Sequence, residues 1–193
     1  MRIIGGKYKG LKLLPPDDTK IRPTSDRLKE SLFSIITSSK YKINIDNCNV
    51  LDICSGTGSL GIEAFSRGAI SVYFIDKDHR SINLIYKNIS KLNIDNKFEN
   101  KIKIIKDEAT KALKNIKKIF QIVLMDPPYN TNIIEKCLFK LKELNLINQH
   151  SYIFIESSKV EDFNYDGYQI LDIKLYGNSK LTILRLLNSS SIE

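Results

Sequence analysis

The sequence has little of what disulfide frameworks, metal centres and membrane anchors require. Its three cysteines, Cys48, Cys54 and Cys137, lie far apart, and its two histidines, His79 and His150, are near none of them. No pair has the spacing of metal ligands, so we predict neither a metal site nor a disulfide framework, as is typical of a reducing cytoplasm. No apolar run could span a bilayer, and the charged N-terminus lacks a signal-type apolar core. We therefore expect a cytoplasmic protein without a membrane partner.

Acidic residues are also scarce relative to basic ones. The chain of 193 residues has a formal net charge of +8, and its length suits one domain with a short appendage. Residues 1–30 hold eight lysines and arginines against four acids, so they contribute half of the net charge. This balance favours a polyanionic partner, and a solvated lysine-rich surface is the simpler alternative.

Strand-like and helix-like segments alternate through most of the chain. The expected strands are 50–54, 71–76, 101–106, 120–126, 152–156, 168–176 and 180–187. The expected helices between the first five strands are 59–67, 78–92, 108–116 and 131–144. This rhythm predicts an α/β fold with a mostly parallel sheet and helices on both faces. Only three residues separate the last two strands, so these two must be antiparallel neighbours.

The first forty residues precede this alternation and read as an appendage. Glycines and basic residues interleave with apolar ones over 2–14, which predicts a short β-hairpin. A helix follows, with Thr24 or Ser25 as its N-cap. Its expected buried stripe consists of Leu28, Leu32, Ile35 and Ile36.

A glycine-rich turn joins the strand at 50–54 to the helix that follows it. Gly56 and Gly58 let a ligand approach the backbone closely, and the helix start offers free N–H groups. The spacing also matches the dinucleotide fingerprint, so an NAD-dependent oxidoreductase stays open at this point. Asp52, at the end of the strand, could face a cationic or amino-bearing ligand, or it could instead stabilise the loop.

Two further acids follow the next two strands. Asp76 ends its strand eighteen residues after Gly58, where a carboxylate can accept hydrogen bonds from both hydroxyls of a ribose. Asp107 could accept a hydrogen bond from an adenine amino group, or it could be the N-cap of the following helix. These acids indicate an adenosine-containing ligand, and they do not separate NAD from S-adenosylmethionine.

The motif Asp126-Pro127-Pro128-Tyr129 decides between the two cofactors. It follows a buried strand, so it lies at the carboxyl edge of the sheet beside the glycine loop. An aromatic amine is a poor nucleophile, because its lone pair is delocalised into the ring. Asp126 and a backbone carbonyl near Pro127 can accept both N–H bonds of such an amine and favour a tetrahedral nitrogen. Proline fixes the chain, and Tyr129 can stack on the base, so the motif predicts methyl transfer by positioning and electrostatics.

The basic N-terminal segment carries the candidate contacts to nucleic acid. The candidates are Lys7, Lys9, Lys12, Arg22, Thr24 and Arg27. The basic side chains could hold a phosphate backbone, and Arg22 and Arg27 flank a rigid Pro-Thr helix start. A base inside a structured nucleic acid must also be flipped out of its stack to reach Asp126.

Four stretches of the chain carry a family resemblance. They are the opening Met-Arg-Ile-Ile-Gly-Gly-Lys-Tyr-Lys-Gly and residues 22–33, 51–69 and 126–129. Together they resemble the RsmD-type family, which methylates the N2 atom of a guanine in bacterial small-subunit (16S) ribosomal RNA. The glycine loop and Asp-Pro-Pro-Tyr are shared with many amino-methyltransferases, whereas the stretch 22–33 is more particular. The chain departs from the family pattern at Gly5, Cys54, Ser55 and 176–182.

The resemblance implies a seven-stranded Rossmann-like class I methyltransferase sheet, mostly parallel with its last strand antiparallel. It implies that S-adenosylmethionine binds around Asp52, Gly56, Gly58, Asp76 and Asp107. It places the target guanine at Asp126 to Tyr129 and makes small-subunit ribosomal RNA, or the ribosomal particle, the partner. We expect an RNA-binding appendage at 1–40, a methyltransferase domain at 41–188 and a frayed tail at 189–193, in a monomer.

Other functions stay open from the residues alone. The Asp-Pro-Pro-Tyr motif recognises only a planar amino group, so the substrate could be an adenine or cytosine of DNA, or a protein glutamine. A non-catalytic RNA-binding assembly factor with a vestigial pocket is a further alternative, beside the NAD-dependent oxidoreductase.

Overall fold

The computed structural model describes residues 1–16, 26–41, 43–93 and 100–187. Its seven strands are β1 (Asn49–Ile53), β2 (Ser71–Asp76), β3 (Ile102–Lys106), β4 (Ile122–Met125), β5 (Tyr152–Ser158), β6 (Tyr168–Tyr176) and β7 (Ser179–Leu186). Its helices are α1 (Asp26–Ile36), α2 (Ser59–Ser66), α3 (His79–Ser90), α4 (Ala109–Lys114) and α5 (Ile133–Glu143), with a short 3-10 turn η1 (Ile45–Asn47).

All seven strands belong to one sheet, in the order β3-β2-β1-β4-β5-β7-β6. The first five strands pair in parallel, and β7 is antiparallel to both of its neighbours, β5 and β6. The expected α/β fold with a seven-stranded sheet and an antiparallel last strand is therefore confirmed. The expected N-cap at Thr24 or Ser25 lies outside the described residues.

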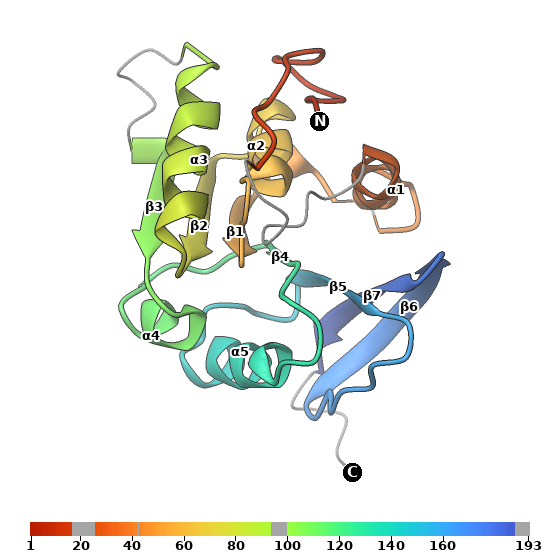
Figure 1. Ribbon diagram of the computed structural model, residues 1–193. Helices are drawn as coiled ribbons and strands as arrows, with labels where there is room; N and C mark the ends of the chain where they lie inside the picture. The colour runs from red at the N-terminus through yellow and green to blue at the C-terminus, as the bar shows by residue number, and fades with distance from the viewer. Residues whose placement is uncertain (17–25, 42, 94–99, 188–193) are drawn as a thin grey trace.

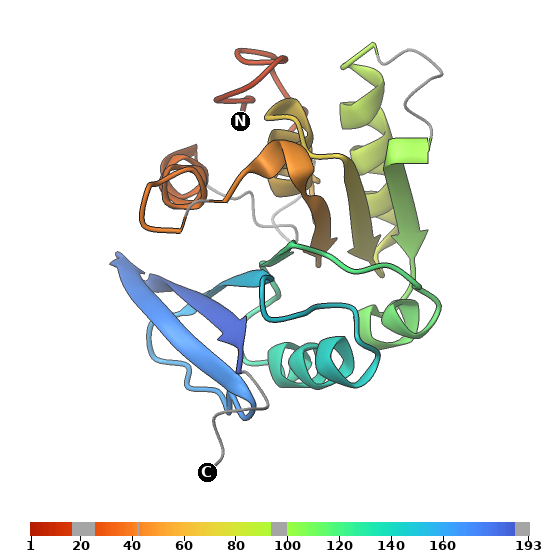
Figure 2. The ribbon, with the colours of Figure 1, turned by 180° about the vertical axis from the view of Figure 1, so that it is seen from behind.

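Helices cover both faces of this sheet (Figures 1 and 2). On one face, α1, α2 and α3 pack with the sheet around a hydrophobic cluster that includes Phe33, Ile62 and Ile85. On the other face, α4 and α5 pack around a second cluster that includes Leu113 and Leu138. Among the parallel strands, β1, β2, β4 and β5 are buried on both sides, which explains their largely apolar sequences, whereas the edge strand β3 is only partly buried.

The N-terminal segment folds back on itself and packs against α2 and α3. Arg2 and Lys12 form an antiparallel bridge, and Ile3 exchanges backbone hydrogen bonds with the returning chain at Gly10 and Leu11. The predicted hairpin is thus present as a tight turn with one bridge. Ile3 and Leu13 lie in the same hydrophobic cluster as α1 and the sheet, so this segment shares the core of the main fold.

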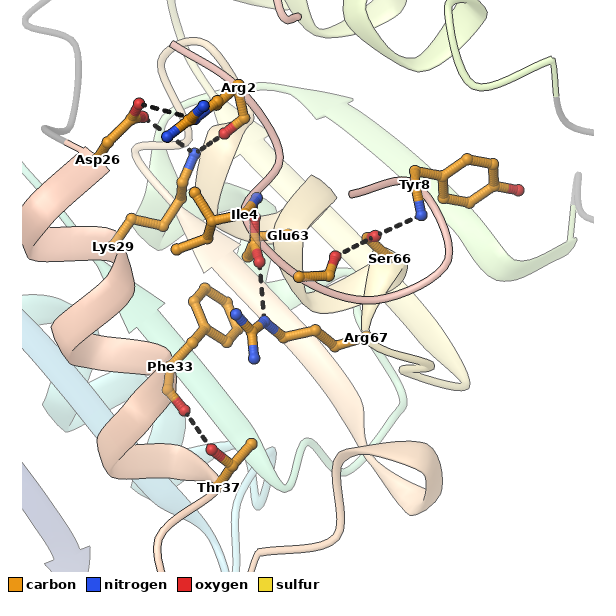
Figure 3. A network of polar contacts seen from close by, with 11 residues as sticks. Arg2, Ile4, Tyr8, Asp26, Lys29, Phe33, Thr37, Glu63, Ser66 and Arg67 are labelled. Atoms are coloured by element: carbon orange, nitrogen blue, oxygen red, sulfur yellow. Dashed lines mark hydrogen bonds and ion pairs between the residues drawn. The ribbon is translucent and has the colours of Figure 1, made fainter. Parts of the chain in front are cut away.

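Buried polar groups attach the N-terminal segment to α2 (Figure 3). The side chain of Glu63 accepts hydrogen bonds from the backbone N–H of Ile4 and from Arg67, both at 2.8 Å. One turn along α2, Ser66 accepts the N–H of Tyr8 at 3.0 Å. Lys29 of α1 is also fully buried and donates to the carbonyl of Arg2. These bonds fix residues 2–8 between α1 and α2.

Candidate active site

A cavity of about 560 Å³ opens at the carboxyl edge of the parallel strands, a size typical of small-molecule sites. Its walls are residues 54–57, 75–78, 107–109, 126–129 and 131–133, together with Ser81 and Lys136. Each of the first four groups lies at or directly after the end of a different parallel strand, because β1, β2, β3 and β4 all end at this edge. The sheet therefore brings the glycine loop, two of the predicted acids and the Asp-Pro-Pro-Tyr motif into one site.

The glycine loop occupies the turn from β1 into α2. Gly56 and Gly58 have positive φ angles of 53° and 75°, which glycine adopts without strain. Gly56 lines the cavity, whereas Gly58 is the N-cap of α2 and does not line it. A side chain at Gly58 would lie 3.0 Å from Ile85, so this glycine lets α2 begin directly against α3.

Asp76 lies at the end of β2, as predicted, and lines the cavity. Its Oδ2 accepts the N–H of Gly56 at 2.8 Å, and its Oδ1 accepts the N–H of Asp78 at 2.9 Å. The carboxylate therefore fixes the glycine loop and the turn into α3 on either side of itself.

Asp107 also lines the cavity, at the end of β3. The N-cap position of α4 is taken by Glu108, and Asp107 accepts the N–H of Glu108 at 2.7 Å. Glu108, and not Asp107, is therefore the N-cap residue of α4. Its place on the cavity wall leaves it suited to the predicted contact with an amino group.

Asp52 is buried beneath the glycine loop and does not line the cavity. Its Oδ2 accepts the N–H of Gly61 in the first turn of α2 at 2.9 Å. Burial raises the pKa of Asp52 to about 8, with smaller contributions from Asp126 and Asp76, while the bond from Gly61 lowers it. This geometry corresponds to the loop-stabilising alternative for Asp52.

Cys54 follows β1 with a φ of 59° and lies on the cavity wall. Burial strongly raises the pKa of its thiol, with the nearby Cys137 as the next contribution. The thiol therefore stays protonated at neutral pH, which agrees with a small loop residue and not with a nucleophile.

The Asp-Pro-Pro-Tyr motif lines the cavity at the end of β4, and β1 lies between this strand and β2, which ends in Asp76. Asp126 follows β4 directly, beside the end of β1, and Pro127 is buried while still reaching the cavity. Thr131 donates to the carbonyl of Pro128 at 2.8 Å, which fixes the turn into α5. Asp126, Pro127, Pro128 and Tyr129 all line the cavity, as the sequence predicted.

Glu161 stabilises this motif from outside the predicted site. Its Oε1 accepts the N–H of Asn130 at 2.6 Å, and its Oε2 accepts the N–H of Ser158 at 2.8 Å. Asn130 has a left-handed φ of 57°, so the carboxylate holds a strained position directly after Tyr129. No sequence motif marks Glu161, because it lies more than thirty residues from Asn130, the residue next to the motif that it contacts.

The candidate RNA-binding residues lie on the N-terminal segment and α1. Lys7, Lys9 and Lys12 are exposed on the hairpin, and Arg27 is exposed on α1. Arg22 and Thr24 lie outside the described residues. The cavity wall also includes two basic residues outside the predicted site, Lys77 and Lys136.

Two kinds of feature are missing from the part of the chain that the structure describes. Among these residues, no group of three or more histidine, cysteine, aspartate or glutamate side chains could hold a metal ion. No helix in the described ranges is long and apolar enough to cross a membrane.

Comparisons with known proteins give a consistent relationship. The family profile described as conserved hypothetical protein 95 matches residues 1–185. An uncharacterised methylase of Rickettsia prowazekii is 33% identical, with 96% of this chain and 97% of the relative aligned. The ribosomal RNA small subunit methyltransferase D of Escherichia coli strain K12 is 31% identical over 81% of this chain and 74% of its own length.

Solved structures agree with these sequence relatives. The solved structure of an Escherichia coli protein, provisionally named a methyltransferase, superposes on this protein with a TM-score of 0.81 and a sequence identity of 25%. It covers 96% of this chain, and this chain covers 97% of it. Since a family profile spans nearly the whole sequence and the fold is that of a class I methyltransferase, the chain belongs to the RsmD-type methyltransferase family.

Proposed function

We propose that the protein transfers a methyl group from S-adenosylmethionine to the exocyclic N2 amino group of a guanine in small-subunit ribosomal RNA. The observation that carries this proposal is one cavity with two different groups of lining residues. Asp76 and Asp107 line it at the ends of β2 and β3, and Asp126 to Tyr129 line it at the end of β4, on the other side of β1 in the sheet. A hydroxyl-bearing adenosine ligand suits the first group, and a planar amine suits the second.

The residues present fit S-adenosylmethionine. Gly56 has no side chain between the cavity and the loop backbone, so a ligand can lie directly against that backbone. The Asp76 carboxylate would accept the hydroxyls of the ribose, and Asp107 would accept the amino group of the adenine. Asp52 would act by keeping the start of α2 in place. When bound, S-adenosylmethionine supplies an electrophilic methyl group on a sulfonium sulfur.

The chain itself positions and polarises the amine. Asp126 would accept one N–H of the guanine amino group, and a backbone carbonyl of the proline pair would accept the other. Both bonds favour a tetrahedral nitrogen whose lone pair is aimed at the methyl group. Tyr129 would stack on the flipped base. After transfer, the cationic nitrogen is strongly acidic and gives its proton to Asp126 or to water, so no highly basic residue is needed.

The RNA substrate is supported by the exposed cations of the N-terminal segment and by the names of relatives. Lys7, Lys9, Lys12 and Arg27 are exposed and could contact phosphates without reading sequence. Several relatives with 31–34% identity bear the name ribosomal RNA small subunit methyltransferase D. N2 of guanine is the atom that the family resemblance implies.

Methyl transfer from labelled S-adenosylmethionine tests the proposal directly. Unmodified small subunits, naked small-subunit RNA, DNA and large subunits would be offered in parallel, and the modified nucleoside identified by mass spectrometry. We expect N2-methylguanosine in small-subunit RNA. A methylated adenine or cytosine, or transfer to DNA, would refute the substrate while retaining the amine chemistry. Binding of NAD, or tight RNA binding without transfer to any acceptor, would refute the enzyme assignment.

Asp126→Ala tests the role of the carboxylate. The variant is expected to bind S-adenosylhomocysteine within about twofold of the wild type and to lose turnover by at least about a hundredfold, as when one oriented acceptor or donor is removed from other active sites. Asp166→Ala removes an exposed acid and is the matched control, with unchanged turnover expected. Calorimetry and single-turnover methylation separate the two effects, and full activity in Asp126→Ala would contradict the proposed role.

A further inference from the structure

The side chain of Asn88 lies fully buried on α3, where it joins two segments of the chain. Its Oδ1 accepts the N–H of Leu14 at 2.7 Å. Its Nδ2 donates to the carbonyl of Leu14 at 3.3 Å and to the carbonyl of Thr57 at 3.0 Å. The amide thus pairs with the backbone of Leu14 on one side and with the glycine loop on the other.

The Thr57 side of this link belongs to the cavity. Thr57 lines the cavity next to Gly56, so a ligand there lies against the same backbone that Asn88 holds. The hydroxyl of Thr57 also donates to the sulfur of Met1 at 3.5 Å. The glycine loop is therefore in direct contact with the N-terminal segment as well as with α3.

The Leu14 side of the link belongs to the basic hairpin. Leu14 ends the turn that carries Lys7, Lys9 and Lys12 and directly precedes the stretch that leads to α1. Lys91, also near the end of α3, donates to the carbonyl of Lys12 at 2.9 Å. The position of the hairpin end is therefore set by α3, and Asn88 links this end to the glycine loop.

The geometry points to Asn88 as a positioning residue that couples the binding of cofactor and RNA. This inference rests on the proposed function, because it takes the cavity as the cofactor site and the hairpin as an RNA contact. A ligand that fixes the Thr57 backbone also fixes Leu14 through one amide group, and RNA that fixes the hairpin fixes the loop in return. The first ligand to bind therefore orders residues that the second would otherwise have to order, so the second binds at a lower entropy cost. Cofactor and RNA must then increase each other's affinity by the same factor.

A binding cycle measures the coupling. The dissociation constant of small-subunit ribosomal RNA is determined with and without saturating S-adenosylhomocysteine. Wild-type protein is expected to bind RNA at least about fivefold more tightly with the cofactor analogue. In Asn88→Leu, which keeps the number and branching of the side-chain heavy atoms and removes all three hydrogen bonds, that ratio is expected to fall to about one. A wild-type ratio of one, or an unreduced ratio in Asn88→Leu, would overturn the inference.

Tyr168→Phe is the control for a general loss of stability. The hydroxyl of Tyr168 donates to the carbonyl of Leu138 at 2.6 Å, and this buried bond lies between β6 and α5, away from the glycine loop. Its loss should destabilise the fold by an amount typical of a buried hydrogen bond while leaving the coupling ratio unchanged. A ratio that falls equally in both variants would show that Asn88 has only a structural role.

Hydrogen exchange tests the link without any substitution. The N–H of Leu14 does not line the cavity, yet its exchange is expected to slow when S-adenosylhomocysteine binds to the wild-type protein, because its acceptor is held by the fixed loop. The N–H of Ile3, which donates to Leu11 at 2.9 Å within the hairpin, serves as the reference. Unchanged exchange at Leu14 would refute the link. Slowed exchange in a protein that methylates no RNA would refute the proposed function and retain the link.

Discussion

At the scale of single residues, the unusual feature is a carboxyl group buried beneath the glycine loop. Asp52 is 1% exposed, and two other acids, Asp76 and Asp126, lie close enough to raise its pKa. Because the main cause is burial, the group retains its proton where an exposed aspartate has lost it. This has a measurable consequence for stability as a function of pH.

The Asp52 carboxyl makes the fold less stable as pH rises. Its pKa of about 8 in the folded state lies above the value of about 4 for the unfolded chain. Between these two values the native state holds a proton that the unfolded chain has released, so raising the pH favours unfolding, by at most about 1.4 kcal/mol per pH unit. Asp52→Asn cannot titrate and still offers an acceptor to Gly61. Its stability relative to wild type should therefore increase from pH 5 to pH 8.

Urea unfolding at pH 5 and pH 8 checks this expectation. The difference in free energy of unfolding between Asp52→Asn and wild type is compared at the two pH values. Asp166→Asn changes an exposed acid and should show the same difference at both. A constant difference for Asp52→Asn as well would mean that Asp52 does not titrate in this range.

At the scale of elements, α2 connects the glycine loop with the N-terminal segment. Its first turn follows the glycine loop, and its last turn carries Glu63 and Ser66, which bind the backbone at Ile4 and Tyr8. Arg67 bonds to Glu63 and covers the ring of Phe33 in α1, with 4.9 Å between the guanidinium carbon and the ring centre. One helix therefore orients three parts of the molecule.

Glu63→Ala should strongly destabilise the protein. The substitution leaves the partly buried N–H of Ile4 without the buried Glu63 acceptor and removes the ion-pair partner of Arg67, so we expect a loss of about 3 kcal/mol or more. Glu143→Ala on α5 is the matched control, because Glu143 forms a partly exposed ion pair with Lys140. A change within about 0.5–1 kcal/mol is expected there. Equal losses in urea unfolding would contradict the role of the Glu63 network.

Local patterns predicted the helices and strands well, because the spacing of apolar residues and the positions of turn glycines depend only on short stretches of sequence. The β6 strand begins and ends as expected, at Tyr168 and Tyr176, and β2 likewise at Ser71 and Asp76. Long-range polar contacts were not predictable in this way. Lys29 lies next to the apolar stripe of α1, and nothing in the sequence shows that it is fully buried against the carbonyl of Arg2.

The same limit applies to the site. Asp76, Asp107 and Asp126 could be placed from sequence, because each follows a parallel strand and such strands end at one edge. Glu161 and Asn88 could not, since each acts on a segment more than thirty residues away. Asn88 in particular occupies a helix interior, where asparagine has no local role that a pattern would reveal.

At the scale of the whole molecule, positive charge is concentrated in two separate regions. Residues 1–30 carry half of the net charge of +8. Residues 100–118, which include β3 and α4, hold seven lysines against two acids. Because β3 is one of the two edge strands of the sheet and the hairpin packs on α2 and α3, these regions can be tested separately.

The hairpin lysines should account for part of the salt dependence of RNA binding. Replacing Lys7, Lys9 and Lys12 with alanine is expected to flatten the slope of log affinity against log salt by up to about 2, at about 0.7 for each phosphate contact on a single strand. A control with Lys103, Lys114 and Lys117 replaced by alanine removes the same charge, and its slope should stay at the wild-type value. Equal flattening in both variants would indicate net charge alone and contradict a localised contact.

The position of β7 has a consequence for how the chain folds during synthesis. This strand is the last of the seven in chain order, yet it lies between β5 and β6 and pairs with both. Until it has left the ribosome, β5 presents an unpaired edge with the apolar residues Ile153 and Ile155, and β6 has no sheet partner among the described strands. Such an edge invites pairing with other chains. The nascent protein is therefore most exposed to aggregation just before its final strand emerges, and its sheet closes in a single late step.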